Sequence, residues 1–393
     1  MAKPTVVVKH GYEESQMAFD AMAQVFQHHA AGKAVLLKPN AGRVSKARTG
    51  VCTNAEVVRG VIRFFKQQGA GKIIVGDGAI WGENTDEALA SAGIKAMCDQ
   101  EGVDCVNLDK FPPVDKDIND GVMVSRLKFS SLVFAVDLVV SIPVIKTHMY
   151  TGASLSIKNM KGCLYGIEKT RLHRLNKPSP DLSKGRCLDW GIADLAAVLM
   201  PDYALIDGTY CLEGLGPSVG TPIYLGLVAA SRDAVSADYI AVDLMGLNRA
   251  AVPHLKLVQE RCRDEVDADI AVEPLAYRRY GQTFATADRA QLVNVYPQIS
   301  LVEKGSCSGC SAAIMTFIHR HGKEFDKNNP LILAAGKDLT PADINKKNVV
   351  LVGNCAGQAS RGRPYCPGCP PVASGILSFI RERGVDDRGP THR

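Results

Sequence analysis

The sequence predicts an α/β fold in which mostly parallel sheets are covered by helices. Short β-branched runs alternate with segments of helical periodicity through the first half of the chain. The same alternation restarts near Ala290. Because 393 residues suit two or three domains, we expect two larger α/β lobes, 1–136 and 137–290, and a small C-terminal α/β domain, 291–384. Residues 385–393 are charged and are expected to form a disordered tail.

The N-terminal lobe shows the alternation most clearly. Its expected strands are Thr5–Lys9, Ala34–Lys38, Lys72–Val75 and Asp104–Leu108, and its expected helices are Glu14–His29, Ala55–Gln68 and Thr85–Glu101. Asn54 is a suitable N-cap for the second helix, and Gly69 a suitable stop. Sites in parallel sheets form at the carboxyl ends of strands, so we expect function first in the loops 38–53 and 76–85.

The rest of the chain continues this pattern. A buried strand, Leu132–Ile142, precedes an amphipathic helix, Ser154–Tyr165, and a long surface loop, Thr170–Arg186. Two strands, Asp202–Asp207 and Pro222–Ala229, flank a glycine-rich segment. The remaining expected helices are Leu188–Leu199, Asp233–Met245, Val252–Glu265, Ser311–His321 and Val372–Arg383, and the remaining strands are Ile299–Glu303, Leu331–Ala335 and Val349–Gly353.

Composition narrows the class of protein. The formal net charge of +5 is too small to argue for nucleic acid. The basic clusters Arg43–Arg48 and Lys158–Arg174 suit a small anionic substrate or cofactor, although a solvated charged face explains either one equally well. The N-terminus does not resemble a signal peptide, and no apolar run reaches the ~18 residues of a membrane helix. We therefore expect a cytoplasmic protein, in which twelve cysteines indicate metal or redox use over disulfides.

Five cysteines gather near the C-terminus. They stand in the motifs Cys307-Ser-Gly-Cys310, Gly353-Asn-Cys355-Ala356 and Cys366-Pro-Gly-Cys369-Pro-Pro371. An iron–sulfur cluster needs four such ligands, of which Cys369 or Cys366 is the fourth. One alternative is a zinc site made by the two Cys-x-x-Cys pairs, which leaves Cys355 unused. The other is a set of buried, unligated thiols.

The same motifs resemble the proximal-cluster motif of nickel–iron hydrogenase small subunits and of the related complex I subunit. That resemblance covers about a quarter of the chain. It implies a C-terminal iron–sulfur domain in which Cys307, Cys310, Cys355 and Cys369 bind a [4Fe-4S] cluster. Cys366 departs from the pattern as a fifth thiol.

A second candidate site combines lysines and histidines. His148 ends a strand, and Lys158 and Lys161 begin a helical segment, an arrangement suited to acid–base or anion-binding work. The candidate catalytic residues are His148, Lys158, His173 and Glu213, and the candidate substrate-binding residues are Lys38, Asn40, Arg43, Lys146 and Lys161. The simpler interpretation is that these are solvated charges, a strand cap and, for Glu213 and Asp207, ordinary turn residues.

Ordered motifs connect the chain to a known family. They are Lys38-Pro-Asn40, Val140-Ser-Ile-Pro-Val-Ile-Lys-Thr-His148 running into Leu155-Ser-Ile-Lys-Asn-Met-Lys-Gly162, and Asp207-Gly-x4-Glu213-Gly-x-Gly-Pro217 leading to Ala230-Ser-Arg-Asp-Ala-Val-Ser-Ala-Asp238. Together they resemble the iron–sulfur-associated family called domain of unknown function 362, over about Val35 to Leu247. Many members append a ferredoxin-type domain, whereas this chain has the hydrogenase-like cysteines.

A fainter similarity concerns the nickel-pincer lactate racemases. Their catalytic histidine, cofactor-holding lysine and nickel-ligating histidine have nearly the spacing of His148, Lys158 and His173. This similarity implies a shared fold. It does not exclude a nickel cofactor or a second metal. Those racemases have another catalytic histidine after an early strand, where this chain has Gly76–Trp81 without a histidine.

Our leading hypothesis is an iron–sulfur oxidoreductase that passes electrons from a [4Fe-4S] cluster to a small anionic organic substrate. One alternative is an electron-transfer or assembly module that serves a partner enzyme, and another is a racemase-like enzyme acting on a 2-hydroxy acid. The leading hypothesis implies an electron donor such as ferredoxin and no membrane partner. A flavin is neither indicated nor excluded, and a homodimer is compatible with the sequence.

Overall fold

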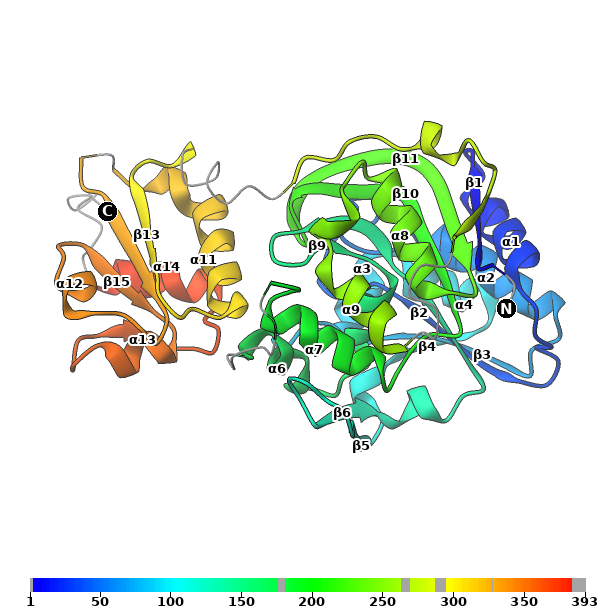
Figure 1. The fold of residues 1–393 in the computed structure, drawn as a ribbon, viewed down its shortest axis with the longest axis horizontal. Helices are drawn as coiled ribbons and strands as arrows, with labels where there is room; N and C mark the ends of the chain where they lie inside the picture. Colours follow the sequence, from blue (N-terminus) through cyan, green and yellow to red (C-terminus); the bar gives the residue numbers. More distant parts are fainter. Residues whose placement is uncertain are drawn as a thin grey trace. The chain divides into compact units, whose positions relative to one another are not determined.

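The computed structural model describes residues 3–175, 181, 183–262, 269–286, 295–326 and 328–383. The chain divides into two compact units, which are described separately. Unit 1 comprises residues 1–172 and 177–287, and unit 2 comprises residues 173–176 and 288–393. Both combine helices with mostly parallel sheets, which confirms the predicted α/β class (Figure 1). The expected tail, 385–393, lies outside the described residues.

Unit 1 is built on one ten-stranded sheet. Its main path has the order β12-β1-β11-β10-β7-β2-β3-β4, with β8 paired to β10 and β9 paired to β8. The strands are β1 (Thr5–His10), β2 (Ala34–Pro39), β3 (Lys72–Asp77), β4 (Asp104–Asn107), β7 (Leu138–Ile142), β8 (Val144–His148), β9 (Gly152–Ser154), β10 (Tyr203–Leu215), β11 (Val219–Ser231) and β12 (Ala271–Glu273). Because β7 pairs in parallel with β2, strands from both expected lobes share one sheet, and the chain is not divided at residue 136.

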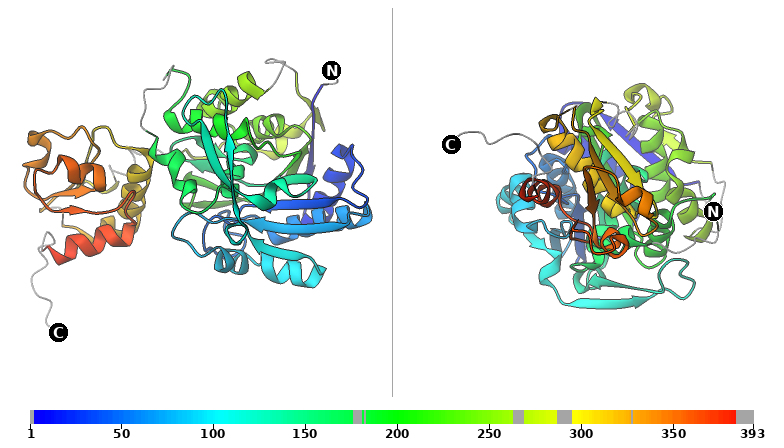
Figure 2. Two further views of the ribbon diagram at one scale, coloured as in Figure 1. Left: turned by 90° about the horizontal axis from the view of Figure 1, so that it is seen from below. Right: turned by 90° about the vertical axis from the view of Figure 1, so that its left-hand side faces the viewer.

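Helices cover both faces of this sheet (Figure 2). One face is covered by α1 (Glu14–Val25), α2 (Ala55–Gln67) and α4 (Ile94–Glu101), and α3 (Thr85–Ser91) packs beside α4. The other face is covered by α5 (Ser156–Asn159) and α8 (Ala234–Leu244). Two more helices, α7 (Cys187–Ala196) and α9 (Pro253–Cys262), pack against α5 and α8. Val35 and Leu37 of β2 join the core under α1 and α2. Leu36 points to the opposite face, because successive strand side chains alternate.

The helix α2 illustrates how local sequence sets an element. The Asn54 side chain accepts a hydrogen bond from Glu56 N at 3.1 Å and so caps the first turn. Val57, Val58 and Val61 are fully buried, as expected of residues spaced along one helical face. The predicted helix Ala55–Gln68 is therefore confirmed almost to the residue.

Three expected elements are interrupted. The expected helix Thr85–Glu101 breaks into α3 and α4 at Gly93, whose φ of +78° leaves the helical region. The expected strand Leu132–Ile142 starts only at Leu138, after a short helical turn. The expected helix Ser154–Tyr165 is replaced by α5 and a 3₁₀ turn, η3 (Met160–Cys163). The last difference matters most, because this segment carries the lysine motif.

The glycine-rich segment after Asp207 is a strand and not a loop. β10 continues to Leu215 and forms a long antiparallel hairpin with β11, with an irregularity between Gly208 and Tyr210. A Cβ on Gly208 would lie 2.4 Å from the Leu227 side chain. Gly208 therefore allows β10 and β11 to pack closely. The glycines of this segment were wrongly taken as the sign of a break between two strands.

Shorter elements complete unit 1. They are the hairpin β5 (Pro113–Asp117) and β6 (Arg126–Ser130), the helix α6 (Glu168–Arg171), and the 3₁₀ turns η1 (Leu108–Lys110), η2 (Ser131–Phe134), η4 (Leu172–Arg174), η5 (Arg249–Ala251) and η6 (Tyr277–Tyr280). The last two residues of η4 belong to unit 2. Among the described residues of both units, every helix is too short or too polar to cross a bilayer.

Unit 2 is a small α/β unit around a parallel sheet of order β13-β14-β15-β16. Its elements are β13 (Ile299–Glu303), α11 (Ser308–His321), η7 (Gly322–Glu324), β14 (Leu331–Ala335), α12 (Pro341–Ile344), β15 (Val349–Val352), α13 (Asn354–Ala359), β16 (Tyr365–Cys366) and α14 (Ala373–Glu382). Leu351 and Ala334 pack with Ala356 in its core. Each parallel strand directs its carboxyl end to the same edge, where the cysteine motifs follow β13, β15 and β16.

Candidate functional site

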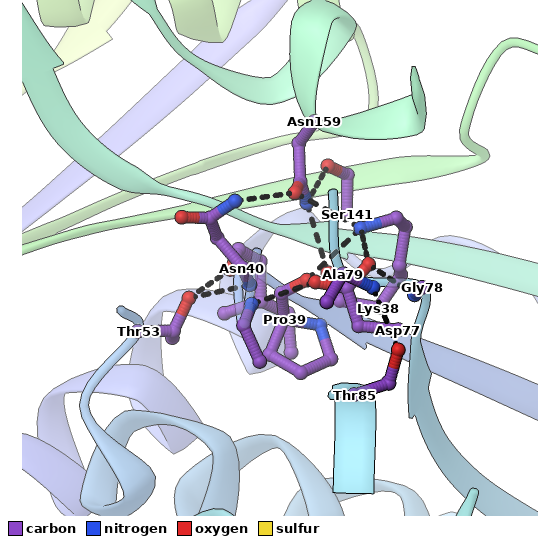
Figure 3. A network of polar contacts seen from close by, with 12 residues as sticks. Lys38, Pro39, Asn40, Thr53, Asp77, Gly78, Ala79, Thr85, Ser141 and Asn159 are labelled. Carbon is purple, nitrogen blue, oxygen red and sulfur yellow. Dashed lines mark hydrogen bonds and ion pairs between the residues drawn. The ribbon is translucent and has the colours of Figure 1, made fainter. Parts of the chain in front are cut away.

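A polar network occupies the carboxyl ends of β2, β3 and β7 in unit 1 (Figure 3). After β2 the chain adds β3 and β4 on one side of it, whereas β7 lies on the other side. This reversal of direction is the topological switch point, where open α/β sheets form their ligand crevices. At the ends of β2 and β7, Thr53 accepts a hydrogen bond from Asn40 N at 2.8 Å and donates one to Ile142 O at 2.7 Å.

A buried ion pair lies at the centre of the network. Lys38 Nζ donates to Asp77 Oδ1 at 2.6 Å, to Asn159 Oδ1 at 3.0 Å and to Pro39 O at 3.1 Å. Asp77 also accepts hydrogen bonds from Ala41 N and Gly78 N. Lys38 was predicted to bind substrate, but its three N–H groups are all engaged within the protein. Asp77 was not predicted; its position between two glycines directly after a buried strand was the available signal.

The motif Lys158–Gly162 packs directly onto this ion pair. Asn159 Nδ2 donates to Lys38 O at 3.0 Å and to Ser141 Oγ at 3.1 Å, so this one side chain joins β2, β7 and α5. A Cβ on Gly162 would lie 2.3 Å from Asp77 Oδ1. Asn159 and Gly162 therefore bring the backbone of the motif to the ends of the strands, and this placement fixes where its lysines can reach.

A buried carboxylate holds the start of α5. Asp238 of α8 accepts hydrogen bonds from Ser156 N at 2.8 Å and from Ile157 N at 3.0 Å. Burial raises the pKa of this carboxyl to about 7. Ser156 belongs to the motif that ends at Gly162 and Asp238 to the motif that begins at Ala230, so this contact joins two of the family motifs.

Three lysines around α5 lack a carboxylate partner among the described residues. Lys146 Nζ donates to the neutral Asn40 Oδ1 at 2.6 Å and to Val51 O at 2.8 Å, and burial lowers its pKa to about 8. Lys158 is 9% exposed, and burial, Lys161 and Lys146 hold its pKa well below the usual value. Burial and the nearby Lys169 charge lower the pKa of Lys161 to about 7. Burial thus favours the neutral amines, and a bound anion would favour their charged forms.

A pocket of about 380 Å³ lies at the carboxyl ends of β3 and β4. Its lining residues are Ala79 to Thr85, Asn107, Asp109, Gly166 and Lys169. The Lys169 ammonium meets both Asp109 carboxylate oxygens at 2.5 Å, so its charge is compensated. Trp81 is exposed. Of the lining residues, Lys169 is the one whose charge acts on Lys161.

His148 has a defined hydrogen-bonding role. Its Nδ1 accepts from Tyr150 N at 3.1 Å and from Thr151 N at 3.3 Å. A ring nitrogen that accepts two N–H groups carries no proton, so neutral His148 holds its proton on Nε2. The Nδ1 atom therefore holds the turn that follows β8.

Asp189 and His254 form a buried pair that the sequence analysis missed. His254 Nδ1 lies 3.4 Å from Asp189 Oδ1, and both side chains are fully buried. Neither of these atoms has a hydrogen-bond partner within the described part of the chain. Asp189 is the one carboxylate among the described residues that raises the pKa of Lys158. A single histidine in a helical pattern gave no sequence signal for this pair.

Arg43, Glu213 and Asp207 have partners within the protein that are distant in the sequence. Arg43 pairs with Glu83 at 3.1 Å. Glu213 accepts a hydrogen bond from Ala285 N at 2.7 Å, which joins β10 to the segment after η6. Asp207 accepts from Asn54 N at 2.7 Å, and burial raises its pKa to about 6. The contacts of Asp207 and Glu213 match structural roles.

In unit 2, four cysteines at the carboxyl edge of the sheet influence one another's pKa values. They are Cys307, Cys310, Cys355 and Cys369. The Cys307 and Cys310 thiols shift each other's pKa values in opposite directions, and the charges of Cys355 and Cys369 raise the pKa of Cys310. The Cys310 thiol, with the N–H groups of the surrounding turn, lowers the pKa of Cys307 to about 6. Gly353 leaves room for this group, since a Cβ there would lie 2.7 Å from Cys310 Sγ.

Cys366 differs from these four. It is buried within β16, and burial alone raises its pKa to about 11, without a contribution from another thiol. Cys369, in contrast, is exposed and acts on both Cys310 and Cys355. As they stand, no three metal-ligating side chains within the described ranges are placed to hold one metal ion.

His173 belongs to unit 2 and not to the unit of His148 and Lys158. Its Nδ1 lies 3.1 Å from Ser308 Oγ, and the Ser308 hydroxyl donates to the His173 carbonyl oxygen at 3.2 Å. The structure therefore brings Lys146, Lys158 and Lys161 together, and assigns His173 to the surroundings of Cys307.

Fold and site define an α/β protein with a buried polar network and a group of lysines at the switch point of its large sheet. The chain belongs to the family described as domain of unknown function (DUF362), whose model matches residues 35–243. This match contains the Lys38–Asp77 pair, the lysine motif and Asp238. The family description names no activity, so function must be argued from the site.

Similar proteins include a thylakoid-associated protein of Synechocystis. It is 27% identical over 253 residues, which cover 63% of this chain and 74% of the relative. Among solved structures, the lactate racemase apoprotein of Thermoanaerobacterium thermosaccharolyticum has a TM-score of 0.40 at 12% identity and covers 97% of this chain and 81% of its own. A Thermotoga maritima protein has a TM-score of 0.36 at 10% identity. The match covers 87% of this chain and 93% of the Thermotoga protein.

Proposed function

We propose that this protein is an iron–sulfur oxidoreductase that passes electrons to a small anionic organic substrate. The observation that carries the proposal is the mutual interaction of the Cys307, Cys310, Cys355 and Cys369 thiols around the space left by Gly353. Four thiolates at one sheet edge form the donor set of a [4Fe-4S] cluster, which supplies one-electron transfer when bound. A low-potential carrier such as ferredoxin would be the electron donor.

We propose Cys369 as the fourth ligand and give Cys366 a structural role. Cys369 is exposed and interacts with two of the other thiols, whereas Cys366 is buried in β16 and interacts with none of them. A zinc site made of the two Cys-x-x-Cys pairs would require Cys366 in place of Cys355. The position of Cys366 therefore favours the cluster over zinc.

The substrate site of this proposal is the lysine cluster of unit 1. Lys146, Lys158 and Lys161 have lowered pKa values and no carboxylate partner in the described residues, and a bound anion would stabilise their charged forms. We propose His148, whose Nδ1 accepts hydrogen bonds from Tyr150 N and Thr151 N, as a further residue of this site. An electron carrier without a substrate of its own would have no need for this cluster of cations.

Metal analysis of two matched variants tests the proposal. In anaerobically purified protein we expect C369S to lose most of its iron, its acid-labile sulfide and its electron paramagnetic resonance signal, and C366S to keep them. Iron-free, zinc-loaded wild-type protein would contradict the proposal. Loss of iron from C366S, with retention in C369S, would contradict the ligand assignment. Cluster chemistry of this kind suits a reducing compartment, and we propose a cytoplasmic location.

A further inference from the structure

The pocket at the carboxyl ends of β3 and β4 has an exposed aromatic side chain in its wall. Trp81 lines this pocket and is 58% exposed, whereas Trp190, the other tryptophan of the chain, is buried. Gly166 belongs to the same lining, and a Cβ there would lie 3.8 Å from Cζ3 of the indole. Because tryptophan is highly buried on average in folded proteins, an indole exposed in a pocket wall requires an explanation.

The loop that carries Trp81 is held in place by the protein itself. Directly before Trp81, Ile80 N donates to Gly42 O in the loop after β2 at 3.0 Å. Ala79 N donates to Thr85 Oγ1 at the start of α3, also at 3.0 Å (Figure 3). The wall of the pocket is therefore formed before any ligand binds, as in most sites for small molecules.

The charged residues of the lining are already paired. Both carboxylate oxygens of Asp109 accept from the Lys169 ammonium at 2.5 Å, and Oδ1 also accepts from Gly166 N at 2.8 Å. Glu83 pairs with Arg43 at 3.1 Å. A charged ligand would therefore find no uncompensated opposite charge in this lining, so the pocket favours an uncharged ligand.

Two asparagines of the lining supply hydrogen-bond donors. The Oδ1 atom of Asn84 accepts from Asp86 N at 3.0 Å and from Glu87 N at 3.2 Å. The Oδ1 atom of Asn107 accepts from Asp109 N at 2.9 Å. These bonds fix which end of each amide is the NH₂ group, and neither Nδ2 donates to another residue in the described part of the chain. A ligand at this wall must therefore offer hydrogen-bond acceptors.

We propose that this pocket binds the uncharged heteroaromatic ring of a nucleoside or of a flavin. The ring stacks on the indole of Trp81, and its ring nitrogens or carbonyl oxygens accept from the amides of Asn84 and Asn107. A sugar fits less well, because its hydroxyl groups must also donate and the oxygens of Asp109 are already engaged. The volume of about 380 Å³ lies in the range of small-molecule sites.

Equilibrium dialysis of the full-length protein tests the proposal with adenosine, guanosine, cytidine, uridine and riboflavin. We expect at least one compound to bind with a Kd below about 1 mM. W81A should weaken this binding at least about fivefold, the usual effect of losing an aromatic stacking partner. Y12A is the matched control, since Tyr12 is 82% exposed and does not line the pocket. Riboflavin alone would assign a flavin, and nucleosides alone would assign a nucleotide.

Two further variants probe the contacts separately. N107D keeps the oxygen that accepts from Asp109 N and removes the amide donor, so affinity should fall by about tenfold. W190F leaves Trp81 as the single tryptophan, whose fluorescence should be quenched by the stacked ring. The proposal would be overturned by the absence of binding for all five compounds, by unchanged affinity in W81A or N107D, or by unchanged Trp81 fluorescence at saturation. Because the site lies in unit 1 and requires no metal, this test is independent of the iron–sulfur function.

Discussion

At the scale of single residues, Lys158 is the most informative position. Burial and the charges of Lys161 and Lys146 lower the pKa of Lys158, whereas the carboxylate of Asp189 raises it. Lys158→Gln keeps most of the side-chain volume and removes the charge. Since a charge-assisted hydrogen bond contributes about 1.5–3 kcal/mol, we expect the affinity for small carboxylates or phosphate to fall by about tenfold to a hundredfold. Isothermal titration calorimetry measures this loss.

Lys72→Gln provides the control for that measurement. Lys72 begins β3 at the end opposite the switch point, is exposed and pairs with Asp104. Its loss should leave the affinity unchanged. Titrations across pH add a second signature, because the pKa values of Lys146 and Lys161 are lowered to about 8 and about 7. Both lysines are charged below these values, so binding should weaken as pH rises from 6 to 9. A pH-independent affinity would exclude this cluster as the anion site.

Residue chemistry could be predicted from the sequence more easily than residue role. The lysine and cysteine motifs are unusual enough to attract attention, and Lys146, Lys158 and Lys161 do lie together. Lys38 was predicted to bind substrate. Its partner Asp77 lies 39 positions away, and no local pattern shows that the two charges meet. Asp189 and His254 were missed for the same reason.

At the scale of elements, the close approach of η3 to the end of β3 is the feature that the site depends on. Gly162 faces Asp77, and Gly78 faces the Gly162 carbonyl oxygen, which would lie 2.5 Å from a Cβ at position 78. We expect Gly162→Ala to destabilise the protein by about 1–3 kcal/mol, the usual cost of overpacking. It should also weaken anion binding, because Lys161 precedes the displaced residue.

The matched control is Gly11→Ala. A Cβ at Gly11 would meet the Met17 side chain at an ordinary 3.5 Å, and Gly11 does not have a positive φ. Its effect should stay within about 0.5 kcal/mol, as for most substitutions away from special features. Urea denaturation followed by circular dichroism measures both variants. Equal stability of the two would show that η3 can move away from Asp77 at no cost.

Sequence periodicity predicts some element boundaries and not others. The helix α2 was predicted almost exactly, because its N-cap and apolar face are both local properties. The segment Ser154–Tyr165 was predicted as one amphipathic helix, yet it forms α5 and η3, because Asp238 and the Lys38–Asp77 pair fix its backbone from distant positions. Tertiary contacts therefore override helical periodicity where the site is built.

At the scale of the whole molecule, the proposed cluster would link separate elements of unit 2. Cys307 and Cys310 lie at the start of α11, Cys355 lies in α13, and Cys369 lies in the loop before α14. The free energy of metal binding to such a set contributes to folding. Unit 1 contains none of these ligands, so the loss of iron should affect the stability of the two units unequally.

Hydrogen exchange with mass spectrometry measures this inequality directly. Anaerobic protein is compared before and after removal of iron by oxidation and chelation. We expect amides of peptides around Cys310 and Cys355 to exchange at least about tenfold faster after removal, which corresponds to about 1.4 kcal/mol of lost local stability. Peptides that cover β2 and β7 should be unchanged. C366S should respond as the wild type does, because its missing thiol lies outside the proposed ligand set. Uniform loss of protection in both units would mean that the metal stabilises the whole chain, whereas no change around Cys310 would contradict its role as a ligand.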